Sequence, residues 1–473
     1  MKKKVVKQVS WLLAAVLTIG SFPFCGSGGM KVKAAETEED IEVEEATQAS
    51  DSGDDWLHTN GKNIVDKKGN VVRLTGANWF GFNCGERLLH GLGWGADLNK
   101  VLKQCADRGI NLLRIPVSTE LLLEWKKGKT VATNFSNSPY FKENPALVNK
   151  NGSSMNNWQV FKKMMKLCKK YGIKVMVDVH SAKADNSGHN YPMWYNTEAG
   201  ISTQDWIDGW VWLVRQFKND DTLIACDLEN EPHGKRDEAQ FAKWDGTKDK
   251  NNWRYAAIKC GEAILKVNPN LLIVVEGIEQ TPKTGHTYKE AAKKDASSAY
   301  TNYNGAWWGG NLRKASKYPV KFSKKAWNKQ VVYSPHDYGP AVYQQTWFQK
   351  NFTEKTLRKD YWYDAWGYLV EKKKTPLLMG EWGGFLDGGK NEKWMNCLAS
   401  YMNKQNISHT FWCINPNSGD TGGLLNNDWK SWDEKKYKIL KKTLWKDKKG
   451  RFIGLDHKKK LGSGGTNVME YYK

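Results

Sequence analysis

Two glutamates flank an asparagine in the stretch LENEP, residues 228–232, immediately after the apolar run Leu223–Cys226. The run is typical of a buried strand, and Pro232 is expected to stop that strand. Burying a carboxylate without a partner costs several kcal/mol, so acidic side chains at the end of a core strand indicate a chemical role. In a strand with a period of two, Glu229 and Glu231 point to the same side, and either could supply a reactive carboxyl group.

Several other apolar runs also end in a polar or ionisable residue. The carboxyl ends of parallel barrel strands converge on one bowl, where the active sites of such folds lie, so these side chains are predicted to form one site. One such residue could be a buried polar side chain whose hydrogen bonds are made within the core. Several residues of complementary type that point to one place are hard to explain as structural. The set is Arg114, His180, Asn230 with Glu231, His336 with Tyr338, Glu381 and Trp412.

The residue types in this set favour cleavage of a glycosidic bond. Two carboxyl groups can do this when one protonates the leaving oxygen and the other attacks the anomeric carbon or activates water. A carboxylate held by an arginine and a tyrosine hydroxyl stays ionised and suits a nucleophile, while a carboxyl with fewer donors keeps a higher pKa and suits an acid. Aromatic rings in the loops YPMWY and AWWGGN offer flat apolar faces to sugars.

Other reaction classes lack their signatures in this sequence. It contains no metal-ligand cluster, Gly-rich phosphate loop or nucleophilic serine elbow, which disfavours metallohydrolase, kinase and esterase activities. We therefore expect a reaction that uses neither a metal nor an organic cofactor.

The elements that must position these residues alternate along the chain. Eight apolar runs of strand length are separated by amphipathic helical patterns, such as residues 97–109 and 156–172, each closed by a glycine that fits a helix C-cap. Such alternation indicates a parallel sheet covered on both faces. Eight runs over about 390 residues predict an α/β fold, a (β/α)8 TIM barrel in a single catalytic domain over residues 56–446. The expected strands begin at Val71, Leu112, Lys174, Ile224, Leu271, Val331, Thr375 and His409.

Motifs across this region resemble glycoside hydrolase family 5, most closely its bacterial endo-β-1,4-glucanase (cellulase) branch. The resemblance rests on RLTGANWFGF, LLRIPVS, DLENEPH, AWWGGNL, SPHDYGPAVYQQTWF, LLMGEWGG and NPNSGDTGG, which lie within residues 60–446. The family implies a retaining enzyme on a (β/α)8 barrel, with its two catalytic glutamates on strands four and seven. The Asn-Glu-Pro and Gly-Glu motifs occur in that order here.

Carried over residue by residue, the resemblance implies a role for each of the strand-end side chains. Glu231, which directly follows Asn230, resembles the general acid/base, and Glu381 resembles the nucleophile. The loops after Phe82 and His180 depart from the family pattern, and both are expected to border the substrate groove. The residues implied to bind the substrate or to orient the catalytic pair are Arg114, His180, Asn230, His336, Tyr338, Trp412, Asn78, Trp194 and Trp308.

The two ends of the chain differ in composition from the region between them. Residues 1–34 combine a basic start, a short apolar stretch and the small-residue pattern VKA, which predicts a cleaved signal peptide and a secreted protein. Residues 35–55 are strongly acidic and are expected to form a disordered leader. Residues 447–473 are basic and Gly-containing, and we expect an irregular tail that activity does not require.

Net charge and cysteine content bear on the partners of the protein. The formal charge of +21 raises nucleic acids and anionic surfaces as partners. The lysines are scattered without a nucleic-acid-binding motif, so a solvated surface that favours anionic cell walls is the preferred interpretation. The seven cysteines beyond Cys25 lack metal-ligand spacing and are expected to be buried thiols. We expect a monomer that binds a β-glucan polysaccharide, and neither nucleic acid nor membrane.

Three alternatives stay open beside an endo-β-1,4-glucanase. A β-glycanase of the same fold could act on mannan, xyloglucan or mixed-linkage glucan, and reducing-end release from carboxymethylcellulose, glucomannan and β-mannan distinguishes these. A catalytically silent carbohydrate-binding protein would bind glucan without turnover. A nucleic-acid binder would retain DNA in a salt-sensitive manner without glycan activity.

Overall fold

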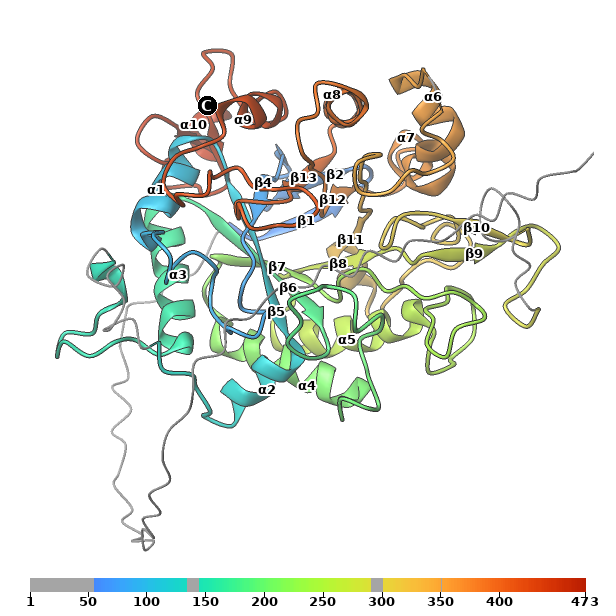
Figure 1. Ribbon diagram of the computed structural model, residues 1–473, viewed down its shortest axis with the longest axis horizontal. Helices are drawn as coiled ribbons and strands as arrows, with labels where there is room; N and C mark the ends of the chain where they lie inside the picture. The colour runs from blue at the N-terminus through green and yellow to red at the C-terminus, as the bar shows by residue number, and fades with distance from the viewer. Residues whose placement is uncertain (1–54, 134–143, 291–300, 350) are drawn as a thin grey trace, which may run out of the picture. The chain divides into compact units, whose positions relative to one another are not determined.

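A sheet of eight parallel strands forms the centre of the structure (Figure 1). The computed structural model describes residues 55–133, 144–290, 301–349 and 351–473. The strands of the central sheet are β4 (Thr75–Asn78), β5 (Leu112–Ser118), β6 (Lys174–Ser181), β7 (Leu223–Asp227), β8 (Leu272–Glu276), β11 (Val331–Ser334), β12 (Leu378–Met379) and β13 (Ser408–Phe411). They follow one another in the order β11, β8, β7, β6, β5, β4, β13 and β12. The bridges Tyr333–Leu377 and His336–Glu381 then join β11 to the β12 segment, which closes the (β/α)8 barrel that the sequence predicts.

Helices alternate with the barrel strands along the chain. In α3, Asn156 and Gln159 form a capping box at the start, and Gly172 ends the helix at φ 75°, a conformation that glycine adopts without strain. The helices α2, α4 and α5 lie along one side of the barrel (Figure 1). The α-helices are α1 (Leu98–Asp107), α2 (Thr119–Lys126), α3 (Asn157–Tyr171), α4 (Thr203–Gln216), α5 (Trp253–Val267), α6 (Glu354–Leu357), α7 (Tyr368–Glu371), α8 (Lys390–Gln405) and α9 (Glu434–Lys441). Two 3-10 helices are η2 (Pro145–Leu147) and η3 (Lys325–Gln330), and η4 (Arg358–Gly367) is a π-helix.

The first predicted strand, which begins at Val71, consists of two separate elements. The chain bends at Arg73 and Leu74, so only the second half joins the barrel as β4, while the first half joins a small antiparallel sheet. Apolar residues continue across the bend, which is why the sequence pattern merges the two. The strands outside the barrel near this end are β1 (Leu57–Asn60), β2 (Asn63–Asp66) and β3 (Val71–Val72), and an antiparallel pair later in the chain is β9 (Gln280–Pro282) with β10 (Tyr303–Gly305).

Apolar side chains of the barrel strands form a cluster that is separate from the larger core. It includes Leu112, Met176, Ala225, Leu272, Val332 and Leu378, one residue from each of six barrel strands. Leu57, Ile64 and Val72 of the β1–β3 sheet pack against it. This second apolar layer explains why the parallel strands read as continuous apolar runs rather than as alternating ones.

The C-terminal segment 447–473 completes this cluster, so the expectation of an irregular tail is wrong. The segment forms β14 and β15, which pair in parallel, followed by a short helix. Leu455 and Val468 are buried in the cluster of barrel residues. The composition of the segment obscures this, because its few apolar residues are separated by charged residues and glycines, and the surface that they cover exists only in the folded barrel. The elements are β14 (Ile453–Gly454), β15 (Thr466–Asn467) and α10 (Val468–Tyr471).

Buried ion pairs fix the same segment to the beginning of the described chain. The ring of His457 contacts Asp55 through Nδ1 (2.6 Å) and Asp66 through Nε2 (3.1 Å). The ammonium of Lys174, at the start of β6, lies 2.5 Å from Asp55 and 3.7 Å from Asp456. Asp55, the last residue of the predicted leader, is therefore part of the fold. The predicted signal peptide and the rest of the leader lie outside the described residues.

Replacing Leu455 with alanine is expected to lower the free energy of unfolding by about 2–4 kcal/mol, because it leaves a cavity in the apolar cluster of the barrel strands. Lys459→Ala, in the same segment but exposed, should change it by less than about 0.5 kcal/mol. Denaturant unfolding of the two variants checks the prediction. Equal stabilities would show that the segment is not part of the cooperative fold.

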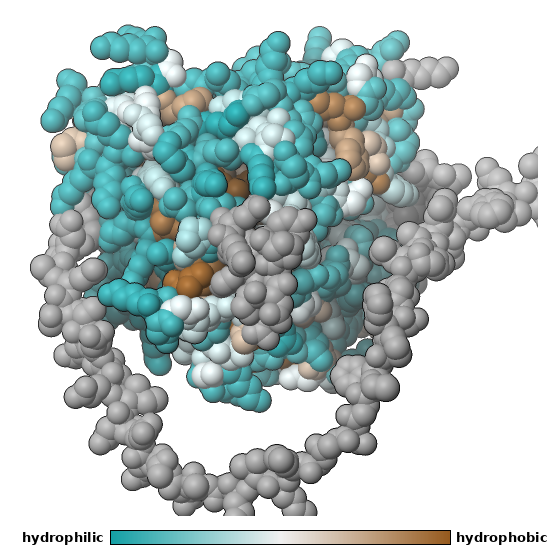
Figure 2. Space-filling view, turned by 60° about the vertical axis from the view of Figure 1, so that its left-hand side comes forward, coloured by the Kyte–Doolittle hydropathy of each residue, from teal (hydrophilic) through white to brown (hydrophobic). Residues whose placement is uncertain are grey.

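The surface and the cysteines agree with the sequence-based expectations. The face drawn in Figure 2 is mostly hydrophilic, with small separate hydrophobic patches. The seven cysteines within the described ranges are all free thiols, and six of them are buried. Among the described residues, no helix combines the length and the apolar character needed to cross a membrane.

Candidate active site

Arg114 of β5 is the centre of the site, although its side chain is fully buried. Desolvation alone would lower the pKa of Arg114, but the surrounding carboxylates raise it well above its ordinary value. The planar guanidinium can hold several oxygens at once in fixed directions. Its partners are Asp178 (3.0 Å), Asp227 (2.8 Å), Glu276 (3.1 Å), Glu381 (2.7 Å), Asn78 (3.1 Å) and Asn230 (3.0 Å).

Glu381, two residues after β12, is held as a carboxylate. Its Oε1 accepts a hydrogen bond from Arg114, and its Oε2 accepts one from the hydroxyl of Tyr338 at 2.5 Å. Burial by itself would raise the pKa of Glu381, but the positive charges of His336 and Arg114 outweigh it and hold the pKa below its ordinary value. Glu381 is therefore ionised at neutral pH.

Glu231 lies beyond the end of β7 in a different electrostatic environment. Its backbone adopts φ 47°, a left-handed conformation that is uncommon for a residue with a side chain. Its Oε1 lies 2.8 Å from Nδ1 of His336. Burial raises the pKa of Glu231 to about 7, with the charge of Glu381 acting in the same direction and the hydrogen bond from His336 opposing it. Glu231 is therefore protonated under mildly acidic conditions in which Glu381 is ionised.

Two histidines of the site have raised pKa values because each faces carboxylates. Burial alone would lower the pKa of His336, but Glu276 and Glu381 raise it well above its ordinary value. Burial would also lower the pKa of His180, and Asp178, 2.6 Å from its Nδ1, raises it instead. The raised pKa values favour the imidazolium form, in which both ring nitrogens donate.

Aromatic rings lie beside these ionisable groups. The partly exposed Trp412, directly after β13, stacks on Phe80 (5.5 Å between centroids) and on His180 (5.4 Å). Trp308, also partly exposed, stacks on His233 at 3.8 Å. Because both rings are partly exposed, they can still be reached by a substrate.

Two residues predicted to bind substrate are enclosed by protein instead. Trp194 is fully buried, its Nε1 donates to Thr203, and its ring packs on Trp253, so it has no surface to offer to a substrate. Asn78 is also fully buried. Its amide nitrogen donates to the backbone oxygens of three neighbouring residues, and its side-chain oxygen accepts from Arg114. Asn78 therefore orients Arg114 and does not contact substrate.

Glu229, the second glutamate of the LENEP stretch, is not exposed to a substrate. The strand ends at Asp227, so the period-two argument that placed Glu229 and Glu231 on one side does not apply. Glu229 is 1% exposed, and burial raises its pKa well above its ordinary value, with Asp178 acting in the same direction. It is a neutral buried acid, whereas Glu231 keeps 14% of its side chain exposed.

Sequence reasoning missed three buried carboxylates that surround Arg114. They are Asp178, Asp227 and Glu276. Each occupies or adjoins a strand end, in VMVDVH, IACDLEN and LLIVVEG, which is the signal that identified the other site residues. The signal was insufficient here because several polar residues compete at each strand end, and only the structure shows which of them face Arg114.

Side chains that could ligate a metal also meet outside the catalytic groups. The ligand atoms of Cys84, Glu86 and His90 lie within 4.8 Å of one another in the loop after β4. The ring of His90 already contacts Glu86 (3.0 Å) and Asn417 (3.1 Å). Two further groups consist of His336 with carboxylates of the site, and each of its ring nitrogens faces a carboxylate of the protein.

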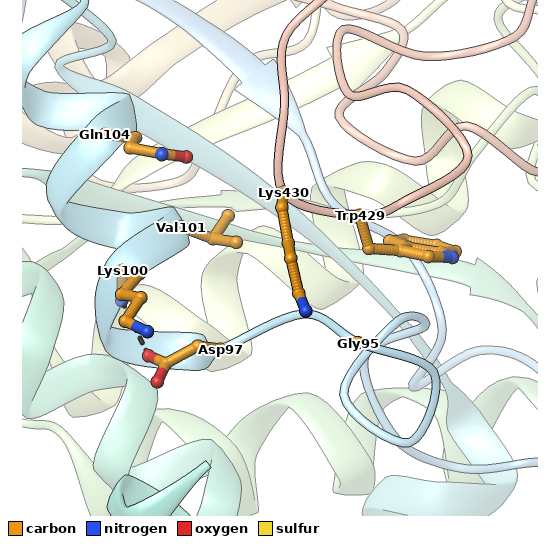
Figure 3. Close-up of a pocket in the computed structure, with 7 residues that line it drawn as sticks. All are labelled: Gly95, Asp97, Lys100, Val101, Gln104, Trp429 and Lys430. Carbon is orange, nitrogen blue, oxygen red and sulfur yellow. Dashed lines mark hydrogen bonds between the residues drawn. The ribbon is translucent and has the colours of Figure 1, made fainter. Parts of the chain in front are cut away.

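A hollow of about 500 Å³ lies on the surface beside α1 (Figure 3). Helix α1 contributes Lys100, Val101 and Gln104, and the loop after Leu425 contributes Trp429 and Lys430. None of the predicted site residues lines it, so it is separate from the groups around Arg114.

The groups around Arg114 combine two carboxyl groups in opposite protonation states. One oxygen of Glu231 and one of Glu381 lie within 4.8 Å of each other, with His336 beside both. An ionised carboxylate next to a protonated carboxyl group, with an aromatic ring close by, can catalyse the transfer of a glycosyl group.

Comparisons with known proteins agree with this chemistry. The Cellulase (glycosyl hydrolase family 5) family matches residues 65–418. Endoglucanase G of Acetivibrio thermocellus is 50% identical, covering 99% of this chain and 83% of that protein, and its Endoglucanase B is 43% identical over 88% and 77%. The solved endocellulase of the archaeon Pyrococcus horikoshii is 30% identical with a TM-score of 0.68, covering 82% of this chain and 98% of that one. From the match over most of its length, its barrel and its paired glutamates, the chain belongs to glycosyl hydrolase family 5, the cellulase family, and is a glycoside hydrolase.

Proposed function

We propose that the protein is an endo-β-1,4-glucanase that hydrolyses internal bonds of cellulose-type β-glucans with retention of configuration. The observation that carries this proposal is the close approach of Glu231 and Glu381, an oxygen of each lying within 4.8 Å. Carboxyl groups about 5–5.5 Å apart serve a double displacement, whereas inverting enzymes need about 6.5–9.5 Å to fit a water molecule. The close approach of the two carboxyl groups supports a double displacement.

The protonation states of the pair support the assignment of roles. Glu381, kept ionised by Arg114 and Tyr338, attacks the anomeric carbon and forms a covalent glycosyl-enzyme. Glu231, whose pKa lies at about 7, first donates a proton to the leaving oxygen. As the resulting carboxylate, it then takes a proton from the water that hydrolyses the intermediate, which restores both groups.

The surrounding residues support a β-glucan as the substrate. The side-chain oxygen of Asn230 is occupied by Arg114, so its amide N–H groups are the donors that remain for a sugar hydroxyl. Trp412 forms the stacking floor beside His180, and Trp308 offers a second ring. A variant of the Pyrococcus horikoshii endocellulase, 31% identical with a TM-score of 0.68, has been solved in complex with cellotetraose.

The activity is expected to fall on both sides of a mildly acidic optimum. Hydrolysis requires Glu381 ionised, and its pKa is depressed, so activity is lost only when the pH falls below the ordinary range of a glutamate. It also requires Glu231 protonated, so activity is lost as the pH rises through about 7. These limits belong to the coupled pair rather than to either residue alone. The profile of kcat/KM on a soluble cello-oligosaccharide checks this, and undiminished activity at pH 9 contradicts it.

Two measurements test the proposed function together. Proton NMR of the first product should show the β-anomer, and an initial α-anomer would overturn the retaining mechanism. Reducing ends should appear faster from carboxymethylcellulose than from glucomannan or β-mannan at equal enzyme concentration. A preference for mannan would keep the mechanism and reassign the substrate.

We also propose that the protein is secreted after cleavage near Ala34. This is supported by the signal-like composition of residues 1–34 and by a relative named as the major extracellular endoglucanase of Xanthomonas campestris, 30% identical over 82% of this chain and 70% of that protein. The positive charge of the chain favours retention at an anionic cell wall.

A further inference from the structure

Glu276, the last residue of β8, is fully buried directly beneath the two catalytic glutamates. Its Oε2 accepts a hydrogen bond from the backbone N–H of Glu231 at 2.7 Å. Its Oε1 lies 3.1 Å from Nε2 of His336 and accepts a hydrogen bond from Arg114 at 3.1 Å. Both oxygens of Glu276 therefore accept hydrogen bonds, from the backbone N–H of Glu231 and from Arg114, and one of them also lies beside the ring of His336.

The contact with Glu231 supports an unusual piece of backbone. Glu231 adopts a left-handed conformation (φ 47°) that L-residues with side chains rarely populate, and such strain persists only where the surroundings fix it. The hydrogen bond from its N–H to a charged acceptor is of the strong kind. Glu276 therefore helps to determine where the side chain of Glu231 points.

His336 provides a second connection between Glu276 and Glu231. One ring nitrogen of His336 faces Glu276 (3.1 Å), and the other faces Oε1 of Glu231 (2.8 Å). The ring of His336 thus lies between Glu276 and the carboxyl group of Glu231, which changes its protonation state during the proposed reaction. The charge of Glu276 sets how strongly His336 holds its second proton.

The loop after β10 packs closely on this arrangement. A β-carbon added to Gly309 would lie 2.5 Å from Oε2 of Glu276 and 3.3 Å from both Cγ of Glu231 and Cγ of His336. A glycine is required at this distance and at its φ of 69°. Packing of this closeness leaves Glu276 with no route to the solvent.

We propose that Glu276 is a positioning residue of the hydrolytic site, which fixes the backbone of Glu231 and keeps His336 in the imidazolium form between the two glutamates. It acts through these residues and does not touch the substrate, since it is fully buried. The inference rests on the proposed function, in which Glu231 is the acid/base.

The direction of the expected change follows from the charges that face His336 and Glu276. They come from Arg114 on β5, Asp227 on β7, Glu231 after β7 and Glu381 after β12, whereas the neighbouring Glu229 is a neutral acid. Glu276→Gln removes a carboxylate that raises the pKa of His336, so His336 loses its positive charge at a lower pH. The pKa of Glu381 then rises, because His336 is the leading cause that lowers it. For Glu231 two changes oppose each other, because loss of the positive charge of His336 raises its pKa whereas loss of the negative charge of Glu276 lowers it.

Glu276→Gln should therefore move the acidic limit of the kcat/KM profile, which Glu381 sets, to higher pH by about one unit. We expect kcat to fall on the order of ten- to a hundredfold with KM unchanged, because no substrate contact is lost. The matched control is Glu229→Gln, a neighbouring buried acid that is already neutral, so its amide should leave the acidic limit in place. An unmoved acidic limit in Glu276→Gln, or a loss of activity that only follows a loss of folded protein in thermal melts, would overturn the proposal.

A second measurement uses the unmodified protein and needs no turnover. Nitrogen-15 NMR of labelled histidines, with His336 assigned by comparison with His336→Asn, should show a doubly protonated ring at pH 7. A neutral ring at that pH would overturn the proposal even if Glu276→Gln does not fold. If the wild-type protein hydrolyses no β-glucan, the proposed function fails, and the spectrum still decides the placement of Glu276 against His336.

Discussion

Replacing Glu381 with alanine should abolish hydrolysis of every β-glucan, with a loss in kcat of at least about four orders of magnitude. The carboxylate is the attacking group, so its removal eliminates the covalent route whatever the leaving group. The loss should be as complete on an aryl cellobioside as on carboxymethylcellulose. Initial rates on both substrates, together with a thermal melt, check the prediction.

The melt serves as the control, because Glu381 also pairs with a buried cation. Removing one partner of a buried ion pair commonly costs about 3–5 kcal/mol when it leaves the other charge uncompensated. Arg114 keeps Asp178, Asp227 and Glu276 after the substitution, so the protein should stay folded. Substantial activity of a folded Glu381→Ala variant would remove Glu381 from the role of nucleophile.

Replacing Glu231 with alanine should have an effect that depends on the leaving group. On natural glucans the departing oxygen needs a proton, so the rate should fall by about two to four orders of magnitude. An activated aryl leaving group needs little protonation, so the glycosyl-enzyme should still form, and its hydrolysis should become the slow step. Azide needs no general base, so adding it should accelerate turnover and yield a β-glycosyl azide.

The configuration of the azide product separates the two glutamates. With Glu381→Ala, azide can attack only from the vacated face and would yield an α-configured product. Proton NMR of the products distinguishes the two anomers. If Glu231→Ala shows no rescue while Glu229→Ala does, the acid has been assigned to the wrong glutamate of the LENEP stretch.

The sequence alone was sufficient to predict the barrel and the identity of most residues around Arg114. Parallel strands buried on both faces must be continuous apolar runs, and the polar residue that ends each run stands at the mouth of the barrel. His180, Asn230, His336, Tyr338, Glu381 and Trp412 could be picked out in this way, and the structure brings them together. Helix α3 was equally visible, because its capping residues and Gly172 are local signals.

Tertiary structure decided which polar residues face one another and where the ends of the chain pack. Glu276 ends β8 and Glu229 follows β7, yet Glu276 accepts hydrogen bonds from Arg114 and from the backbone of Glu231, whereas Glu229 is a neutral buried acid. Their difference depends on neighbours far away in the sequence. The same reason applies to Trp194, which reads as an exposed loop tryptophan and is buried against Trp253. Leu455 packs in the apolar cluster of the barrel strands. The sequence does not reveal this contact, because the surface that Leu455 covers forms only when strands from the whole chain close into a barrel.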